Sequence, residues 1–213
     1  MRPRAHATFA QQPRISFSRV TASKCRGNSI AQWICHRPDV PRSHERNSRV
    51  QYSTFNARSE EFTAKPAFRD AWKRGQRCLV VTDGFYEWKK LDPKGKKKQA
   101  YAISIRDDAE MVMAGLWSNW KSRTSGEEIP TCTVLTCGPN KSMAELHDRM
   151  PVILAKSDWP AWLGEEPATE QELLALLKPC PDELLKFWAV DNRVGNIRNQ
   201  GPELARPIEP ALV

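Results

Sequence analysis

The sequence predicts a single α+β domain with short helices and a mostly antiparallel, barrel-like sheet. Several short runs rich in β-branched and aromatic residues are separated by turn residues, which is typical of strands. Short helical patterns lie between these runs, and no internal repeat or linker follows residue 60. A chain of 213 residues is long enough to bury a core of its own.

The expected strands are six runs at residues 77–82, 101–105, 111–117, 131–136, 151–154 and 187–190. The second and third runs flank a short polar turn at 106–110, so we expect them to pair as a hairpin. Helices are expected at 65–74, 141–147 and 169–177. The first of these has Pro66 at its start and Gly75 after its end, as helix boundaries commonly do.

The chain is uneven in charge and composition, which divides it into two parts. Its net charge is +8, and residues 1–60 hold 11 basic and three acidic residues, whereas the remainder holds 22 of each. The first 60 residues also contain no Leu, and residues 13–52 have no sustained apolar period. We therefore divide the chain into an atypical Arg-rich segment at 1–52 and a folded domain at 53–213. A disordered arm, a transit peptide and a stretch translated in a shifted frame are open interpretations of the first segment.

The composition also excludes some classes of protein. No apolar run approaches the length of a membrane-spanning helix, and no apolar stretch of a secretory signal follows the basic N-terminus. The six cysteines lack the spacing of a disulfide framework, so we expect free thiols, Cys132 and Cys137 among them, in a reducing cytoplasm. Neither a metal nor another cofactor is expected.

Four segments carry polar residues that packing does not readily explain, at 55–61, 82–88, 145–151 and 190–203. Glu87 stands between two aromatic residues, and burial there would raise its pKa into a range that suits proton transfer. His147 is followed by an acidic and a basic residue, which could tune its charge. Each feature has a structural alternative, such as pairing of Glu87 with Lys89 or capping of a helix by His147.

Together these segments resemble the SRAP family, the SOS response-associated peptidases or abasic site processing proteins. The resemblance covers about residues 53–210 and rests on ordered motifs: NAR-x-E at 56–60, KPAF at 65–68, DGFYEW at 83–88, HDRMP at 147–151 and VGN-x-x-N-x-GPE at 194–203. It implies one α+β domain that binds single-stranded DNA in a basic groove. In the family, an N-terminal Cys reacts with the aldehyde of an abasic site and forms a covalent protein–DNA crosslink.

The resemblance also implies roles for six residues. Asn56 would orient the nucleophile, Glu87 would shuttle protons during opening of the sugar, and His147 would act on the sugar oxygen or the departing phosphate. The remaining three would bind DNA: Arg58 and Arg149 through phosphates, and Trp88 by stacking at the lesion. The resemblance implies a monomer that binds single-stranded DNA containing abasic sites. It also implies a location in the bacterial cytoplasm or nucleoid, with no membrane partner.

The resemblance is weakest at the N-terminus, where residues 8–11 echo only the family's Phe-Ala-Gln. Arg2 occupies the position at which the family has its Cys, so we expect at most an imine on the α-amine of Met1, assisted by Glu87, rather than a stable crosslink. Two other functions are open. The protein could be a DNA-binding module without covalent capture, or a peptidase limited to its own processing.

Overall fold

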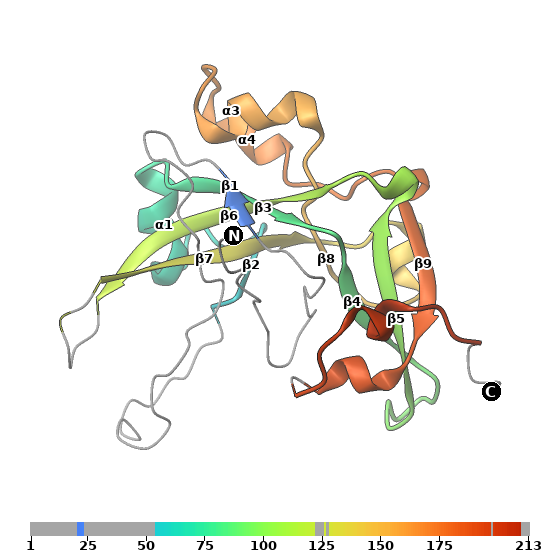
Figure 1. Ribbon diagram of the computed structural model, residues 1–213. Coiled ribbons are helices and arrows are strands. Elements are labelled where there is room, and N and C mark those ends of the chain that lie inside the picture. Colours follow the sequence, from blue (N-terminus) through green and yellow to red (C-terminus); the bar gives the residue numbers. More distant parts are fainter. Residues whose placement is uncertain (1–20, 24–53, 122–125, 127, 197, 210–213) are drawn as a thin grey trace, which may run out of the picture.

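A computed structural model describes residues 21–23, 54–121, 126, 128–196 and 198–209 (Figure 1). The expectations for residues 1–20 and 24–53 lie outside these ranges, so the division of the chain at residue 52 stays a prediction. The described part is a mixed α+β fold with short helices, as the sequence predicts, and its strands form two sheets.

The larger sheet has six strands. Its main path runs in the order β1 (Thr21–Ser23), β3 (Arg77–Thr82), β6 (Met111–Lys121), β7 (Glu128–Cys137) and β2 (Asn56–Arg58), and β8 (Met150–Pro151) also pairs with β7. The β2–β7 pair is parallel and the other pairs are antiparallel. The predominance of antiparallel pairing is therefore confirmed.

The smaller sheet has the order β4 (Phe85–Lys90), β5 (Lys98–Ile105) and β9 (Leu185–Val190), all antiparallel. It stands at one end of the larger sheet (Figure 1). Neither sheet is closed into a barrel by the described strands, so the barrel-like closure expected from the sequence is not found there.

The chain passes between the two sheets at two neighbouring crossings. β3 leads into β4 through Asp83 and Gly84, and β5 leads into β6 through the 3-10 turn Arg106–Asp108. The Ser104 hydroxyl donates a hydrogen bond of 2.7 Å to the carbonyl of Asp83, which ties the two crossings together. This corner fixes the direction in which β4 leaves the larger sheet.

The predicted hairpin between residues 101–105 and 111–117 is wrong. Both segments are strands, but β5 pairs with β4 and β9, whereas β6 pairs with β3 and β7. Asp107 in the connecting turn has a left-handed backbone with a φ of 61°, and the turn redirects the chain to the other sheet. A short polar connection predicts a turn but not which strands pair across it.

The three predicted helices are all present, each shorter than predicted, and one further helix, α3, was not predicted. α1 spans Pro66–Lys73, with Gly75 beyond its end at a φ of 66°. α2 spans only Lys141–Ala144, and α4 spans Glu170–Ala175 behind a capping box formed by Thr169 and Glu172. Between them lies α3 (Trp159–Leu163), and 3-10 turns include η4 (Asn192–Gly195) and η5 (Pro202–Ala205).

The main hydrophobic core lies against the larger sheet, and a second cluster lies against the smaller one. Trp162, Phe62 and Phe85 are among the largest fully buried side chains of the main core. The second cluster includes Tyr86 and Val190, with Trp88 packed against it. Among the described residues, no helix combines the length and apolar character needed to cross a membrane.

Candidate functional site

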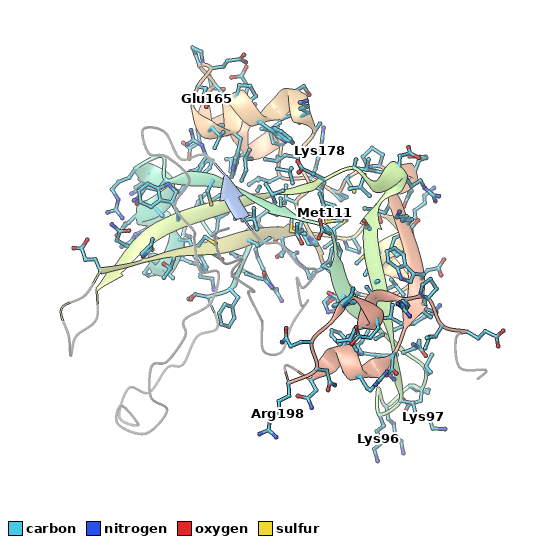
Figure 2. All side chains as sticks on the ribbon, viewed as in Figure 1. Lys96, Lys97, Met111, Glu165, Lys178 and Arg198 are labelled. Carbon is cyan, nitrogen blue, oxygen red and sulfur yellow. The ribbon has the colours of Figure 1, made fainter. Side chains whose placement is uncertain are left out.

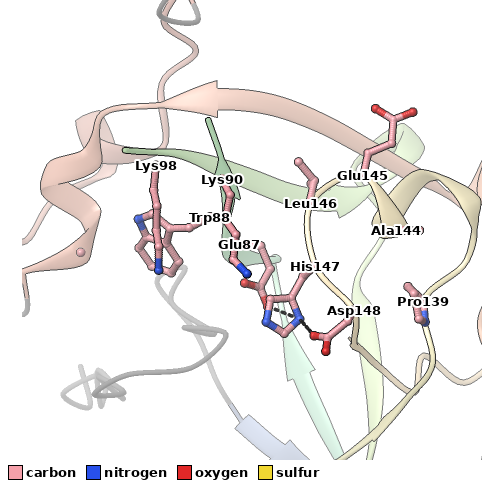
Figure 3. Close-up of a pocket in the computed structure, with 11 residues that line it drawn as sticks. Glu87, Trp88, Lys90, Lys98, Pro139, Ala144, Glu145, Leu146, His147 and Asp148 are labelled. Atoms are coloured by element: carbon pink, nitrogen blue, oxygen red, sulfur yellow. Dashed lines mark ion pairs between the residues drawn. The ribbon is translucent and has the colours of Figure 1, made fainter. Parts of the chain in front are cut away.

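A pocket of about 1110 Å³ lies beside strand β4, and it collects several of the predicted site residues. Its walls come from β4, from the start of β5, from the segment at 139–148 and from Gly195. Glu87, Trp88 and His147 all line it, although they are far apart in the sequence (Figure 3). The structure thus brings together half of the six residues that the sequence singles out.

Glu87 is the buried acidic group of this pocket. It shares a face of β4 with Phe85, which belongs to the main core, and its side chain is only 4% exposed. Burial raises the pKa of its carboxyl group to about 8, against weaker lowering effects from the Trp88 backbone and Lys98. Within the described residues, its Oε1 atom has no hydrogen-bond partner. Glu87 is therefore a protonated, available acid at neutral pH.

His147 lies beside Glu87 in the lining of the pocket (Figure 3). The helix α2 holds it there, because the amide of His147 donates a 2.8 Å hydrogen bond to the carbonyl of Met143. Its Nδ1 atom lies 3.9 Å from Oε1 of Glu87 and 3.1 Å from Oδ1 of Asp148 (Figure 3). The amide of Arg149 also donates to Nδ1 at 3.0 Å. Nδ1 also lies 3.3 Å from the carbonyl oxygen of Arg149, so it faces one donor and two acceptors, and these contacts do not by themselves fix the tautomer of the ring.

Trp88 and two lysines form another side of the pocket. The indole of Trp88 is partly buried against the second hydrophobic cluster, and a Cβ added to Gly195 would lie 3.7 Å from its ring. Lys90 and Lys98 are direct cross-strand partners on β4 and β5, and both line the pocket. Trp88 therefore packs against the second cluster and also lines the pocket.

Arg149 does not line the pocket, and its guanidinium group is already engaged. It donates to both carboxylate oxygens of Glu60, at 2.8 and 2.9 Å, and to the carbonyl of Thr136. The hydrogen bond from Arg149 is the largest cause that lowers the pKa of Glu60. The phosphate-binding role of Arg149 stays a prediction, and it would require this bidentate pair to open.

Asn56 and Arg58 lie on β2, in the larger sheet, and neither lines the pocket. Asn56 is half-buried at a position opposite Val134. Arg58 is exposed and lies 3.8 Å from Glu61. Their roles toward a nucleophile and toward phosphates also stay predictions.

The structure adds pocket residues that the sequence did not single out, above all Lys90, Lys98 and Asp148. A prediction of the register between β4 and β5 would have identified the two lysines, because this register sets residue 90 opposite residue 98. Asp148 belongs to the quoted motif, and its charge helps to raise the pKa of Glu87. Only the fold reveals this coupling.

The cysteines are divided between two states. Cys78, Cys137 and Cys180 are buried free thiols, and burial raises the pKa of Cys137 to about 11. Cys132 is disulfide-bonded, so the expectation of a free thiol is wrong at that position. Among the described residues, no group of three or more His, Cys, Asp or Glu side chains could hold a metal ion.

The sequence model of one protein family, described as SOS response associated peptidase (SRAP), matches residues 7–197. The chain belongs to the SRAP family. The match begins well before residue 53, where our motif-based resemblance starts, and ends short of residue 210. It therefore extends the family relationship into the Arg-rich segment.

Several relatives are named abasic site processing proteins. The SRAP chain is 35% identical over 159 residues to YoqW of Bacillus subtilis (strain 168), covering 75% of this chain and 69% of the relative. It is 36% identical to YoaM of the same organism over 159 residues, covering 75% and 68%. It is also 30% identical to HMCES of Gallus gallus over 181 residues, covering 76% of this chain and 52% of the relative.

Solved structures support the same fold. A protein from Bacteroides thetaiotaomicron matches with a TM-score of 0.63 and 27% identity, over 73% of this chain and 66% of that one. A phage-related protein from Bordetella bronchiseptica matches with a TM-score of 0.55 and 25% identity, over 85% and 84%.

Proposed function

We propose that this SRAP protein binds single-stranded DNA at abasic sites and opens the abasic sugar in the pocket beside β4. The observation that carries the proposal is the state of Glu87. A carboxyl group with a pKa of about 8 stands in the wall of a pocket of about 1110 Å³, with one oxygen free of hydrogen bonds from the described residues. The names of the SRAP relatives supply the substrate class.

The reaction that needs such a group is the opening of a cyclic hemiacetal, the closed form of an abasic deoxyribose. Protonated Glu87 donates its proton to the ring oxygen O4′ while its second oxygen accepts the proton of the C1′ hydroxyl group. The C1′–O4′ bond breaks and a C1′ aldehyde forms, so the carboxyl group ends protonated as it began. General acid–base catalysis of this kind contributes about 10²–10⁴-fold.

His147 complements this step from its position beside Glu87. In the tautomer whose Nδ1 accepts from the amide of Arg149, the ring presents an Nε2 proton to the substrate. That donor suits the sugar oxygen or the departing 3′ phosphate. The pair thus consists of an acid that exchanges protons and a neighbouring donor that stabilises developing negative charge.

An amine of the protein completes the proposed covalent step. It adds to the aldehyde and gives a carbinolamine, and loss of water, assisted by protonated Glu87, gives an imine. The α-amine of Met1, the nucleophile expected from the sequence, lies outside the described residues. Asn56, which the resemblance assigns to orienting that nucleophile, lies on β2.

Arg58 and Trp88 are proposed to hold the DNA around the lesion. Arg58 is exposed on β2, with its guanidinium group only loosely paired at 3.8 Å. Trp88 lines the pocket, and its indole is proposed to stack beside the missing base. Because phosphate contacts release counterions, the affinity should fall steeply with salt.

The test is fluorescence anisotropy with four DNA molecules: a single strand and a duplex, each with and without one abasic site. We expect tighter binding to the single strands and the tightest binding to the abasic one. Equal affinity for duplex and single strand would refute the DNA-binding proposal. Equal affinity for abasic and intact single strands would refute recognition of the lesion.

A further inference from the structure

The connection between β4 and β5 carries an unusual concentration of positive charge. Residues 89–98 read KKLDPKGKKK, with six lysines and a single aspartate. Residues 61–213 as a whole have no net charge. We call this segment, together with the flanking ends of β4 and β5, the lysine hairpin. Because the domain as a whole has no net charge, this positive charge is a local feature of the lysine hairpin.

The turn of the lysine hairpin is held by hydrogen bonds, while most of its lysines form no ion pair with another described residue. The carboxylate of Asp92 accepts a 2.7 Å hydrogen bond from the amide of Lys97, and the amide of Leu91 donates to the carbonyl of Lys97 at 2.9 Å. Lys89 lies 3.8 Å from Glu145. For the other five lysines no ion pair is found among the described residues, and all five are exposed: Lys90, Lys94, Lys96, Lys97 and Lys98.

This arrangement is unfavourable for the free protein. Lys90 and Lys98 are directly opposite each other in the antiparallel pair, and like charges in that position destabilise a sheet. A ligand with negative charge would relieve the repulsion. Both lysines also line the pocket, so the positive charge begins at the rim of the candidate site and continues to the tip of the hairpin.

The lysine hairpin extends the basic surface away from the pocket. Lys96 and Lys97 mark its tip, at the end of the smaller sheet away from α3 and α4 (Figure 2). The side chain of Arg198 projects at the same end of the molecule in this view, from the loop that follows η4 (Figure 2). The basic surface therefore extends to one side of the pocket.

We propose that the lysine hairpin binds the phosphates of the DNA strand on one side of the abasic nucleotide. The inference rests on the proposed function and deepens it, because it assigns one flank of the strand to a defined surface. A row of flexible ammonium groups suits a phosphate backbone, which is recognised by charge and without sequence preference. An acidic protein would use the same charges, but the continuity with the pocket favours the strand that the pocket holds.

The test compares two single-stranded oligonucleotides of equal length, with the abasic site near the 5′ end in one and near the 3′ end in the other. The variant is the double substitution Lys96→Glu and Lys97→Glu, at exposed turn positions outside the pocket. We expect its affinity to fall about tenfold for the oligonucleotide whose long flank reaches the hairpin, and to change little for the other. For the affected oligonucleotide, the slope of log affinity against log salt should become shallower by about 0.7 for each lost contact.

A matched control changes the same charge elsewhere. Lys156→Glu with Lys178→Glu alters two exposed lysines near α3 and α4, and Lys178 lies at the far end of the molecule from the hairpin (Figure 2). The control should weaken binding to both oligonucleotides equally and only slightly. Equal losses for both oligonucleotides in the hairpin variant, or no loss, would overturn the inference while the proposed function stands. Failure of the unmodified protein to bind either oligonucleotide would overturn both.

Discussion

The Oε1 atom of Glu87 lies 3.9 Å from Nδ1 of His147, a separation too long for a hydrogen bond. The two groups come from different parts of the chain, β4 and the segment after α2, and they meet at the wall of one pocket. Because they do not satisfy each other, each remains able to contact a substrate. The function proposed for this SRAP protein depends on that relationship.

The protonation of Glu87 predicts how stability depends on pH. Its pKa rises from an ordinary value of 4.5 to about 8 on folding, so the folded state binds more protons than the unfolded state between these pH values. The free energy of unfolding should therefore fall as the pH rises through this window. Glu87→Gln, which mimics the neutral acid, should match the parent protein at pH 4 and exceed its stability at pH 8.5, by about 5 kcal/mol at most.

Urea unfolding at the two pH values measures this difference. His147→Gln provides a control that leaves the carboxyl group in place. The same stability difference between Glu87→Gln and the parent protein at both pH values would show that Glu87 ionises normally in the folded state.

The charges around Glu87 should move the pH profile of the reaction in opposite directions. The Asp148 carboxylate raises the pKa of Glu87, and the Lys98 ammonium group lowers it. If protonated Glu87 is the acid, activity at saturating DNA falls as the pH passes its pKa. Asp148→Asn should therefore shift this fall to lower pH, and Lys98→Gln should shift it to higher pH. Shifts of the same sign in the two variants would contradict the assignment.

Trp88 should contribute to both packing and binding. Trp88→Ala should weaken binding to abasic single-stranded DNA by about 1–3 kcal/mol if the ring stacks on a base. It should also lower stability, because the ring packs against the second hydrophobic cluster. Trp88→Phe keeps an aromatic face and should retain most of the affinity. A loss of stability in Trp88→Ala without any loss of affinity would assign the ring to packing alone.

The contribution of Arg149 to stability should depend on the geometry of its guanidinium group rather than on its charge alone. Its fork binds both oxygens of Glu60 and the carbonyl of Thr136. Arg149→Lys keeps the charge but loses the bidentate pair, and should cost about 1–3 kcal/mol of stability. Arg58→Lys, at an exposed position, is the comparison and should cost little. If Arg149 binds phosphate instead, Arg149→Ala should make the salt dependence of DNA affinity shallower without a comparable loss of stability.

Local signals in the sequence predicted most of the elements. Pro66 and Gly75 bound α1, and the residues of the capping box at Thr169 and Glu172 begin α4, because helix ends depend on nearby residues. The strand pairing was not predictable in the same way. β5 and β6 are consecutive in the chain yet belong to different sheets. The hydrogen bond between Ser104 and Asp83 lies at the corner where the chain passes from one sheet to the other.

The candidate site was predicted in part for a similar reason. The motifs singled out Glu87 and His147, and the aromatic neighbours of Glu87 suggested its raised pKa. The engagement of Arg149 with Glu60 depends on contacts across 89 residues of sequence, which no local pattern contains. Lys90 and Lys98 line the pocket together because the strand register places them opposite each other. The composition of the short loop between the strands does not by itself fix this register.

The most direct test of the central claim is borohydride trapping on a denaturing gel. The substrates are single-stranded oligonucleotides with a natural abasic site or with tetrahydrofuran, an analogue that cannot open to an aldehyde. The account predicts a reduced protein–DNA adduct with the natural site only, formed about 10²–10⁴-fold more slowly by Glu87→Gln, with DNA affinity nearly unchanged. An adduct that forms equally fast in Glu87→Gln, or no adduct from the unmodified protein with the natural site, would contradict it.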